Sequence, residues 1–196
     1  MRTVRNAILI AAGMSLICLV WLANSKTFAQ ATKLPKPIFI QGTARGQAQQ
    51  LGRMFSFNLL INEVSTPEDQ KALLEAFTAK GNEGLVNALS KMTSKGRISI
   101  TGTLGYDVNY IRQFKLPDGT TRIRLVTDRP ITFGEAWSDS RSSDYNLSGI
   151  EIILSPDKKK NSGTLLPACQ FKIDKENHLE IEAFQNPWTL MNIERR

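Results

Sequence analysis

Polar and apolar residues alternate along much of this 196-residue chain, most clearly between residues 96 and 154. Tyr106, Val108 and Tyr110, for example, are separated by single polar residues. Successive side chains of a strand point to opposite faces, so a period of two predicts strands with one apolar face and one solvated face. The pattern therefore predicts an antiparallel sheet that packs its apolar face on a core.

Turn residues join the predicted strands into hairpins. The segment Leu116–Thr120 places a proline where a turn needs a fixed φ and a glycine where it needs a positive φ. The alternation resumes at Arg122–Leu125, with both arginines on the face that we expect to be solvated. Further hairpin turns are predicted at residues 155–163 and 174–177.

The rest of the chain predicts more strands around one helical region. Thr66 is a good N-cap residue, Pro67 suits the first helical position, and Gly81 is typical of a helix end. Asn82 begins a second stretch with helical spacing, so we expect two short helices in a hairpin at about residues 67–94. Their apolar stripes are expected to pack on the sheet or to close one end of a barrel. The additional strands are expected at residues 38–40, 55–61, 164–173, 178–184 and 187–193.

These elements together predict a mainly antiparallel β (α+β) fold, with a barrel-like or strongly curved sheet and a two-helix insertion. Closure removes exposed strand edges, which favours a barrel over an open sheet. With 41% hydrophobic and 22% charged residues, the chain has an ordinary globular composition and is long enough for a sizeable core. We expect a single β-rich domain at residues 38–196, preceded by a linker at residues 32–37.

The N-terminus has the pattern of a secretory signal peptide. Two arginines precede an uncharged stretch at residues 7–23, and small residues follow at Ala29 and Ala31. A basic start, an apolar segment and a small-residue cleavage site define such a signal, so residues 1–31 are predicted to be removed. The alternative is an uncleaved membrane anchor, because the stretch lies at the lower length limit of a spanning helix. We expect an exported protein, either periplasmic or secreted.

Removal of residues 1–31 lowers the net charge from +7 to +4, with 22 basic against 18 acidic residues. This excess is mild and does not favour nucleic-acid binding, which needs clustered basic residues. Lys158–Lys160 is a basic run, but it falls at a predicted hairpin tip and is expected to be solvated.

The sequence contains no catalytic or metal-binding motif of known spacing. His178 is the only histidine, and Cys169 is the only cysteine after residue 31. Hydrolases need a base beside the nucleophile, and zinc sites need clusters of such residues, so we expect no metal and no cofactor. Cys169 alternates with Phe171 on the apolar side of its strand, which predicts a buried and inert thiol.

The densest group of polar side chains lies at residues 128–145. Three interpretations compete: a solvated loop held by side-chain to backbone hydrogen bonds, a binding rim with aromatic surfaces and anion-holding arginines, or a calcium or carboxylate-pair site. The residues of the predicted rim are Asp128, Arg129, Glu135, Trp137, Arg141, Asp144 and Tyr145. The candidate carboxylates are Asp128, Glu135, Asp139 and Asp144.

Several short motifs give the chain a resemblance to a family. They are Gly96-Arg97-Ile98, Gly105-Tyr106-Asp107, Leu116–Gly119, Thr127–Ile131, Glu135-Ala136-Trp137 and Arg141–Tyr145. In these motifs the chain is similar to a family of exported bacterial proteins of unassigned function. The resemblance implies a bacterial exported protein and supplies no catalytic residues.

A barrel scaffold that commonly encloses ligands, without a catalytic set, favours a non-enzymatic binding protein for a small or apolar ligand or an envelope component. One alternative is a carboxylate-dependent hydrolase acting in the periplasm or outside the cell. Another is a structural or interaction protein with no ligand. A membrane is a predicted partner only if the N-terminal segment is uncleaved, and the sequence leaves the oligomeric state open.

We expect the chain, exported from a bacterial host, to yield a mature protein that begins at Gln30 or Thr32. Cleavage follows small residues, and Ala29 and Ala31 supply them after the apolar stretch. The intact mass of the purified protein measures the cut. A mass that still includes residues 1–31 would instead support the membrane anchor.

Overall fold

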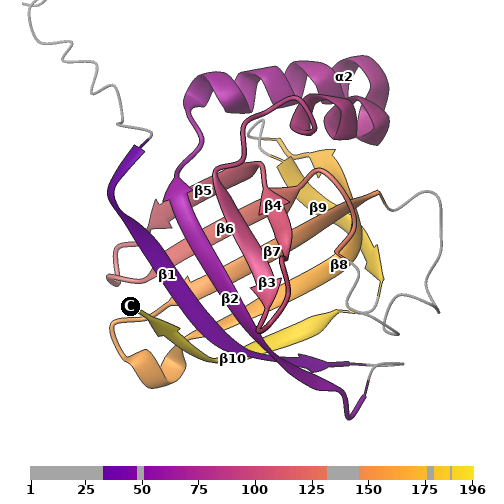
Figure 1. Cartoon of the computed structure of the whole chain (residues 1–196). Coiled ribbons are helices and arrows are strands. Elements are labelled where there is room, and N and C mark those ends of the chain that lie inside the picture. The colour runs from indigo at the N-terminus through magenta and orange to yellow at the C-terminus, as the bar shows by residue number, and fades with distance from the viewer. Residues whose placement is uncertain (1–32, 48–50, 132–145, 176–178, 186) are drawn as a thin grey trace, which may run out of the picture. The chain divides into compact units, whose positions relative to one another are not determined.

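The structure is a computed structural model that describes residues 33–47, 51–131, 146–175, 179–185 and 187–196 (Figure 1). All of them belong to one compact unit, Thr32–Arg196. This part of the chain is mostly antiparallel β sheet, as the alternation predicts. Its strands are β1 (Lys33–Gly46), β2 (Met54–Glu63), β3 (Gly96–Ile100), β4 (Tyr106–Val108), β5 (Tyr110–Lys115), β6 (Thr121–Thr127), β7 (Leu147–Leu154), β8 (Ser162–Ile173), β9 (Leu179–Gln185) and β10 (Trp188–Arg195).

The described strands form a nearly closed barrel in the order β4-β3-β2-β1-β10-β8-β7-β6-β5, and β9 pairs with β8 outside this path. The two ends of the order, β4 and β5, are separated in the chain only by Asn109. Ser65, just after β2, bonds to β5 through two hydrogen bonds with Ile111, of 2.8 and 2.9 Å. The sheet therefore curves until its first and last strands meet (Figure 1).

Apolar side chains fill the barrel interior. Ile123 and Leu125 of β6 point inward as predicted, and they pack with buried residues such as Ile40, Leu59 and Ile98 from the other strands. With β4 and β5 counted as one bent strand, eight described strands surround this core. Side chains alone can fill a barrel of that size.

A second core lies on the outer face of the barrel. The alternation predicts a solvated face there, but part of it is covered by α2 (Pro67–Leu89) and by the end of β8. Tyr110, expected on the face of Val108, lies in this second core, because the chain is irregular at Asn109 and the alternation reverses there. The buried members of the second core are Leu73, Leu85, Leu89, Tyr110, Val126, Leu147, Leu166, Cys169 and Phe171.

The prediction of two helices is wrong: the described residues contain one α-helix, α2, which ends at Leu89 rather than near residue 94. Its N-terminus is the predicted one, since Thr66 and Asp69 form a capping box. The expected break at Gly81 is a sharp kink inside the helix, with φ 58° and ψ −143° at that glycine. The chain folds back at this kink, which brings Gly84 against the carbonyl of Ala76. These residues are eight apart in the sequence, and in a straight helix they would be about 12 Å apart.

The three predicted hairpins are confirmed by their strand pairs, which are β5 with β6, β7 with β8, and β8 with β9. Residues 176–178, in the third predicted turn and just after it, lie outside the described residues. A short 3₁₀ helix, η3 (Lys158–Lys160), forms the tip of the second hairpin, and its lysines are exposed as expected. At the other end of the chain, Lys33 pairs with Glu63, so strand structure extends into the segment for which we expected a linker.

We expect Gly81→Ala to lower the free energy of unfolding by about 1–3 kcal/mol, because a Cβ disfavours the backbone angles of the kink. Chemical denaturation followed by circular dichroism measures the change. Asn87→Ala is the matched control, because it adds alanine at an exposed position of the same helix. A Gly81→Ala protein as stable as the control would show that the kink does not require glycine.

Candidate functional site

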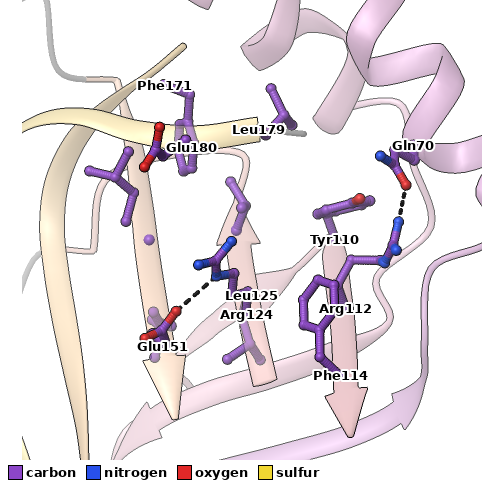
Figure 2. A pocket seen from close by; sticks show the side chains of 14 residues that line it. Gln70, Tyr110, Arg112, Phe114, Arg124, Leu125, Glu151, Phe171, Leu179 and Glu180 are labelled. Atoms are coloured by element: carbon purple, nitrogen blue, oxygen red, sulfur yellow. Dashed lines mark hydrogen bonds and ion pairs between the residues drawn. The ribbon is translucent and has the colours of Figure 1, made fainter. Parts of the chain in front are cut away.

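A cavity with a mostly apolar lining and a volume of about 230 Å³ lies on the outer face of the barrel. We call it the outer cavity. It is bordered by β5, β6, β7, the β8–β9 hairpin and the first turns of α2 (Figure 2). Its lining includes the apolar side chains of Tyr110, Phe114, Val126, Phe171, Leu179 and Ile181 and the charged side chains of Arg112, Arg124, Glu151 and Glu180.

One side of the outer cavity exists because β8 bends over the sheet. The pairing of β7 with β8 shifts register at Ser148, whose hydroxyl donates a 2.6 Å hydrogen bond to the Pro167 carbonyl. Beyond this shift, side chains of β8 and β9 lie close to Gly149. A Cβ on Gly149 would be 3.3 Å from both Cys169 Sγ and Ile181 Cδ1, so the glycine permits this close approach.

A row of charged side chains crosses the cavity on three neighbouring strands. Arg112 of β5 lies directly opposite Arg124 of β6, which lies directly opposite Glu151 of β7; we call these three residues the charged row. Arg124 Nε donates to Glu151 Oε2 at 2.8 Å, and Arg112 donates to the Gln70 side chain of α2 (Figure 2). The strand register therefore brings two guanidinium groups to the same cavity.

The Phe114 ring supports both arginines. The guanidinium carbon lies 5.3 Å from the ring centroid for Arg112 and 5.8 Å for Arg124. Both distances fall within the range of a cation–π interaction. The ring thus limits the positions that the two side chains can adopt.

Positive charge exceeds negative charge at the charged row. Arg122 adds a third guanidinium, with its Nε 3.9 Å from the Glu151 carboxylate oxygen that already accepts from Arg124. That Nε is buried and has no hydrogen-bond partner among the described residues. Like charges directly opposite each other weaken a sheet, so Arg112 and Arg124 are a cost to the fold that Glu151 offsets only in part.

Burial keeps two titratable groups in and beside the cavity, Tyr110 and Cys169, in their neutral form. Burial raises the pKa of Tyr110, against the opposing effect of the Arg112 charge, so its phenol stays protonated. Burial also raises the pKa of the nearby Cys169 thiol to about 12. The prediction of a buried Cys169 is confirmed, and the thiol faces Gly149 inside the second core.

The sequence-predicted rim is described only at its first two residues, and neither lines the outer cavity. Arg129 makes two hydrogen bonds to Asp128, of 2.9 and 3.0 Å, so its neighbour neutralises its charge. The rim and the carboxylate site stay predictions, because their other members lie outside the described residues. These are Glu135, Trp137, Asp139, Arg141, Asp144 and Tyr145, and His178 is also outside.

Sequence reasoning missed the residues of the outer cavity. The alternation placed Arg124 on the outer face correctly, but it treated that face as solvated. Glu151 and Leu179 gave no signal, because each is ordinary within its own strand. Only the pairing of β5, β6 and β7 and the bend of β8 bring them together.

A larger but more polar hollow, of about 410 Å³, lies beside η3 at the tip of the β7–β8 hairpin. Lys158, Lys159 and Arg195 line it together with Glu194. Small-molecule sites are mostly apolar with a few placed polar groups, so the outer cavity is the better candidate.

Two further observations concern the part of the chain that the structure describes. No three His, Cys, Asp or Glu side chains come together there as ligands of a metal ion. No helix there is both long and apolar enough to cross a membrane. Comparisons of the chain with known protein families, characterised proteins and solved structures found no match.

We expect Cys169 to resist thiol reagents in the folded protein at pH 8, because only a thiolate reacts and its pKa is about 12. Reaction of the full chain with Ellman's reagent measures this, with Cys18 replaced by serine to remove the second thiol. In denaturant the same thiol should react readily, since an unperturbed cysteine has a pKa of about 8.5. Equal rates in both conditions would contradict its burial.

Proposed function

We propose that this chain is an exported, non-enzymatic binding protein that holds a small ligand with an apolar body in its outer cavity. The single observation that supports this most is the combination of an apolar lining with a few convergent polar side chains. Cavities of this composition are the usual form of small-molecule sites. The signal-peptide pattern at residues 1–31 supports export.

The packing of the barrel favours a site on its outside. Buried side chains from the surrounding strands occupy the barrel interior, with Ile40, Leu59 and Leu165 fully excluded from solvent. A ligand in the interior would have to displace this core. The outer cavity needs no such rearrangement.

The groups in the cavity favour binding over catalysis. Glu151 is engaged by Arg124 and lies close to Arg122, so it serves to hold the arginines. Cys169 is kept protonated by burial and covered by the second core. Neither group is placed as a nucleophile or a base with an open approach.

The volume of the cavity limits the ligand. A water molecule takes about 30 Å³ of liquid, so 230 Å³ corresponds to roughly eight groups of that size. We therefore expect a compact ligand of about ten non-hydrogen atoms rather than a long lipid chain.

We expect 1-octanol, a neutral ligand of this size, to bind the protein saturably, as measured by titration calorimetry. Leu179→Glu should weaken binding at least tenfold, because it places a charge in the apolar lining. Leu104→Glu is the matched control, since Leu104 is 87% exposed and does not line the cavity. The proposal fails if 1-octanol shows no saturable binding, or if both variants bind it like the unmodified chain.

A further inference from the structure

We infer that the ligand of the outer cavity is an amphipathic organic anion. Its acidic head group would lie at the charged row, against the guanidinium groups of Arg112 and Arg124, and its apolar body would lie against Phe171, Leu179 and Ile181. This inference rests on the function proposed above and adds the chemical class of the ligand.

The charge balance of the cavity supports an anion. Arg112 and Arg124 are direct cross-strand partners on β5 and β6. Figure 2 shows the Arg112 side chain turned toward the neutral amide of Gln70 on α2 and the Arg124 side chain turned toward Glu151. On the far side, Glu180 lies 3.6 Å from Lys172 and its charge is balanced there. The charged side chains of the lining are Arg112 and Arg124 against Glu151 and Glu180. Because Lys172 pairs with Glu180 from outside the lining, Glu151 is left to balance both guanidinium groups, and the charged row keeps an excess of one positive charge.

The arginine geometry suits a planar acidic group. A guanidinium presents a fixed fork of N–H donors that matches the two oxygens of a carboxylate. Arg124 already directs its Nε to Glu151, and this leaves its other donors for a ligand. The Phe114 ring lies within 6 Å of both guanidinium carbons and holds them in place before a ligand arrives.

The apolar end lies opposite these arginines. Figure 2 shows Phe171 and Leu179 on the strand segments that cross above β6, while Arg112 and Arg124 rise from β5 and β6 below. A ligand that spans the cavity therefore meets the guanidinium groups at one end and the apolar side chains of Phe171 and Leu179 at the other, where Glu180 is paired with Lys172. Tyr110, neutral at physiological pH, lies in the lining with them.

Octanoate and 1-octanol share a chain length and differ in the head group. Comparing them therefore separates the binding of an apolar body from the preference for an anionic head group. We expect the full chain to bind octanoate at least tenfold more tightly than 1-octanol in titration calorimetry, because charge-assisted hydrogen bonds exceed neutral ones in strength. The preference should shrink as salt is added, since Arg112 and Arg124 are partly exposed.

The variants Arg112→Gln and Arg124→Gln should each weaken octanoate binding at least tenfold and leave 1-octanol binding within about twofold. Retained 1-octanol binding also shows that each variant is folded. Lys115→Gln is the matched control, because it removes a positive charge from an exposed residue of β5 outside the cavity. It should leave both affinities unchanged.

The possible results bear separately on the anion preference and on the apolar site. Equal binding of octanoate and 1-octanol would overturn the anion and leave the apolar site standing. Loss of octanoate binding in Lys115→Gln to the same extent as in the arginine variants would also overturn it, because general charge would then explain the preference. Absence of binding by both compounds would overturn the proposed function together with this inference.

Discussion

The close contact of β8 and β9 with Gly149 is the constraint on which the rest of the site depends. Because Gly149 has no side chain, Cys169 and Phe171 of β8 and Ile181 of β9 can pack closely against β7 at this position. The outer face of β5, β6 and β7 is then enclosed between two layers. The outer cavity is the space that this enclosure leaves unfilled, and its apolar lining follows from its place beside the second core.

The position of α2 depends on the same arrangement. At the kink the chain turns back, and Asn82 directs its side chain to the backbone of β8. It donates to the carbonyl of Phe171 at 3.2 Å and accepts from the amide of Phe171 at 2.9 Å. These bonds fix the helix to the bent part of β8, so the helix, the strand and the cavity border form one connected unit (Figure 1).

Two arginine environments in this protein show how differently the same charge can be used. Arg129 has its own neighbour Asp128 as a bidentate partner at the end of β6, and little of its charge is available to a ligand. Arg112 and Arg124 both line the outer cavity, and the charged row contains one carboxylate, that of Glu151, for the two of them. An uncompensated charge at the edge of an apolar cavity weakens the fold, and such a cost is more often found where a protein binds a ligand.

The sequence by itself determined the strands, the hairpin turns, the N-terminus of the helix and the burial of Cys169, because each depends on local periodicity, on turn residues or on a capping box. It also indicated a break at Gly81, although that break is a kink in one helix rather than a gap between two. Only the tertiary structure decided that a second core covers part of the outer face. The sequence of a strand with polar residues on one side has the same pattern whether that side meets water or borders a cavity. The union of Arg112, Arg124 and Leu179 in one site likewise needed strand register and the bend of β8, which are set by contacts between segments far apart in the chain.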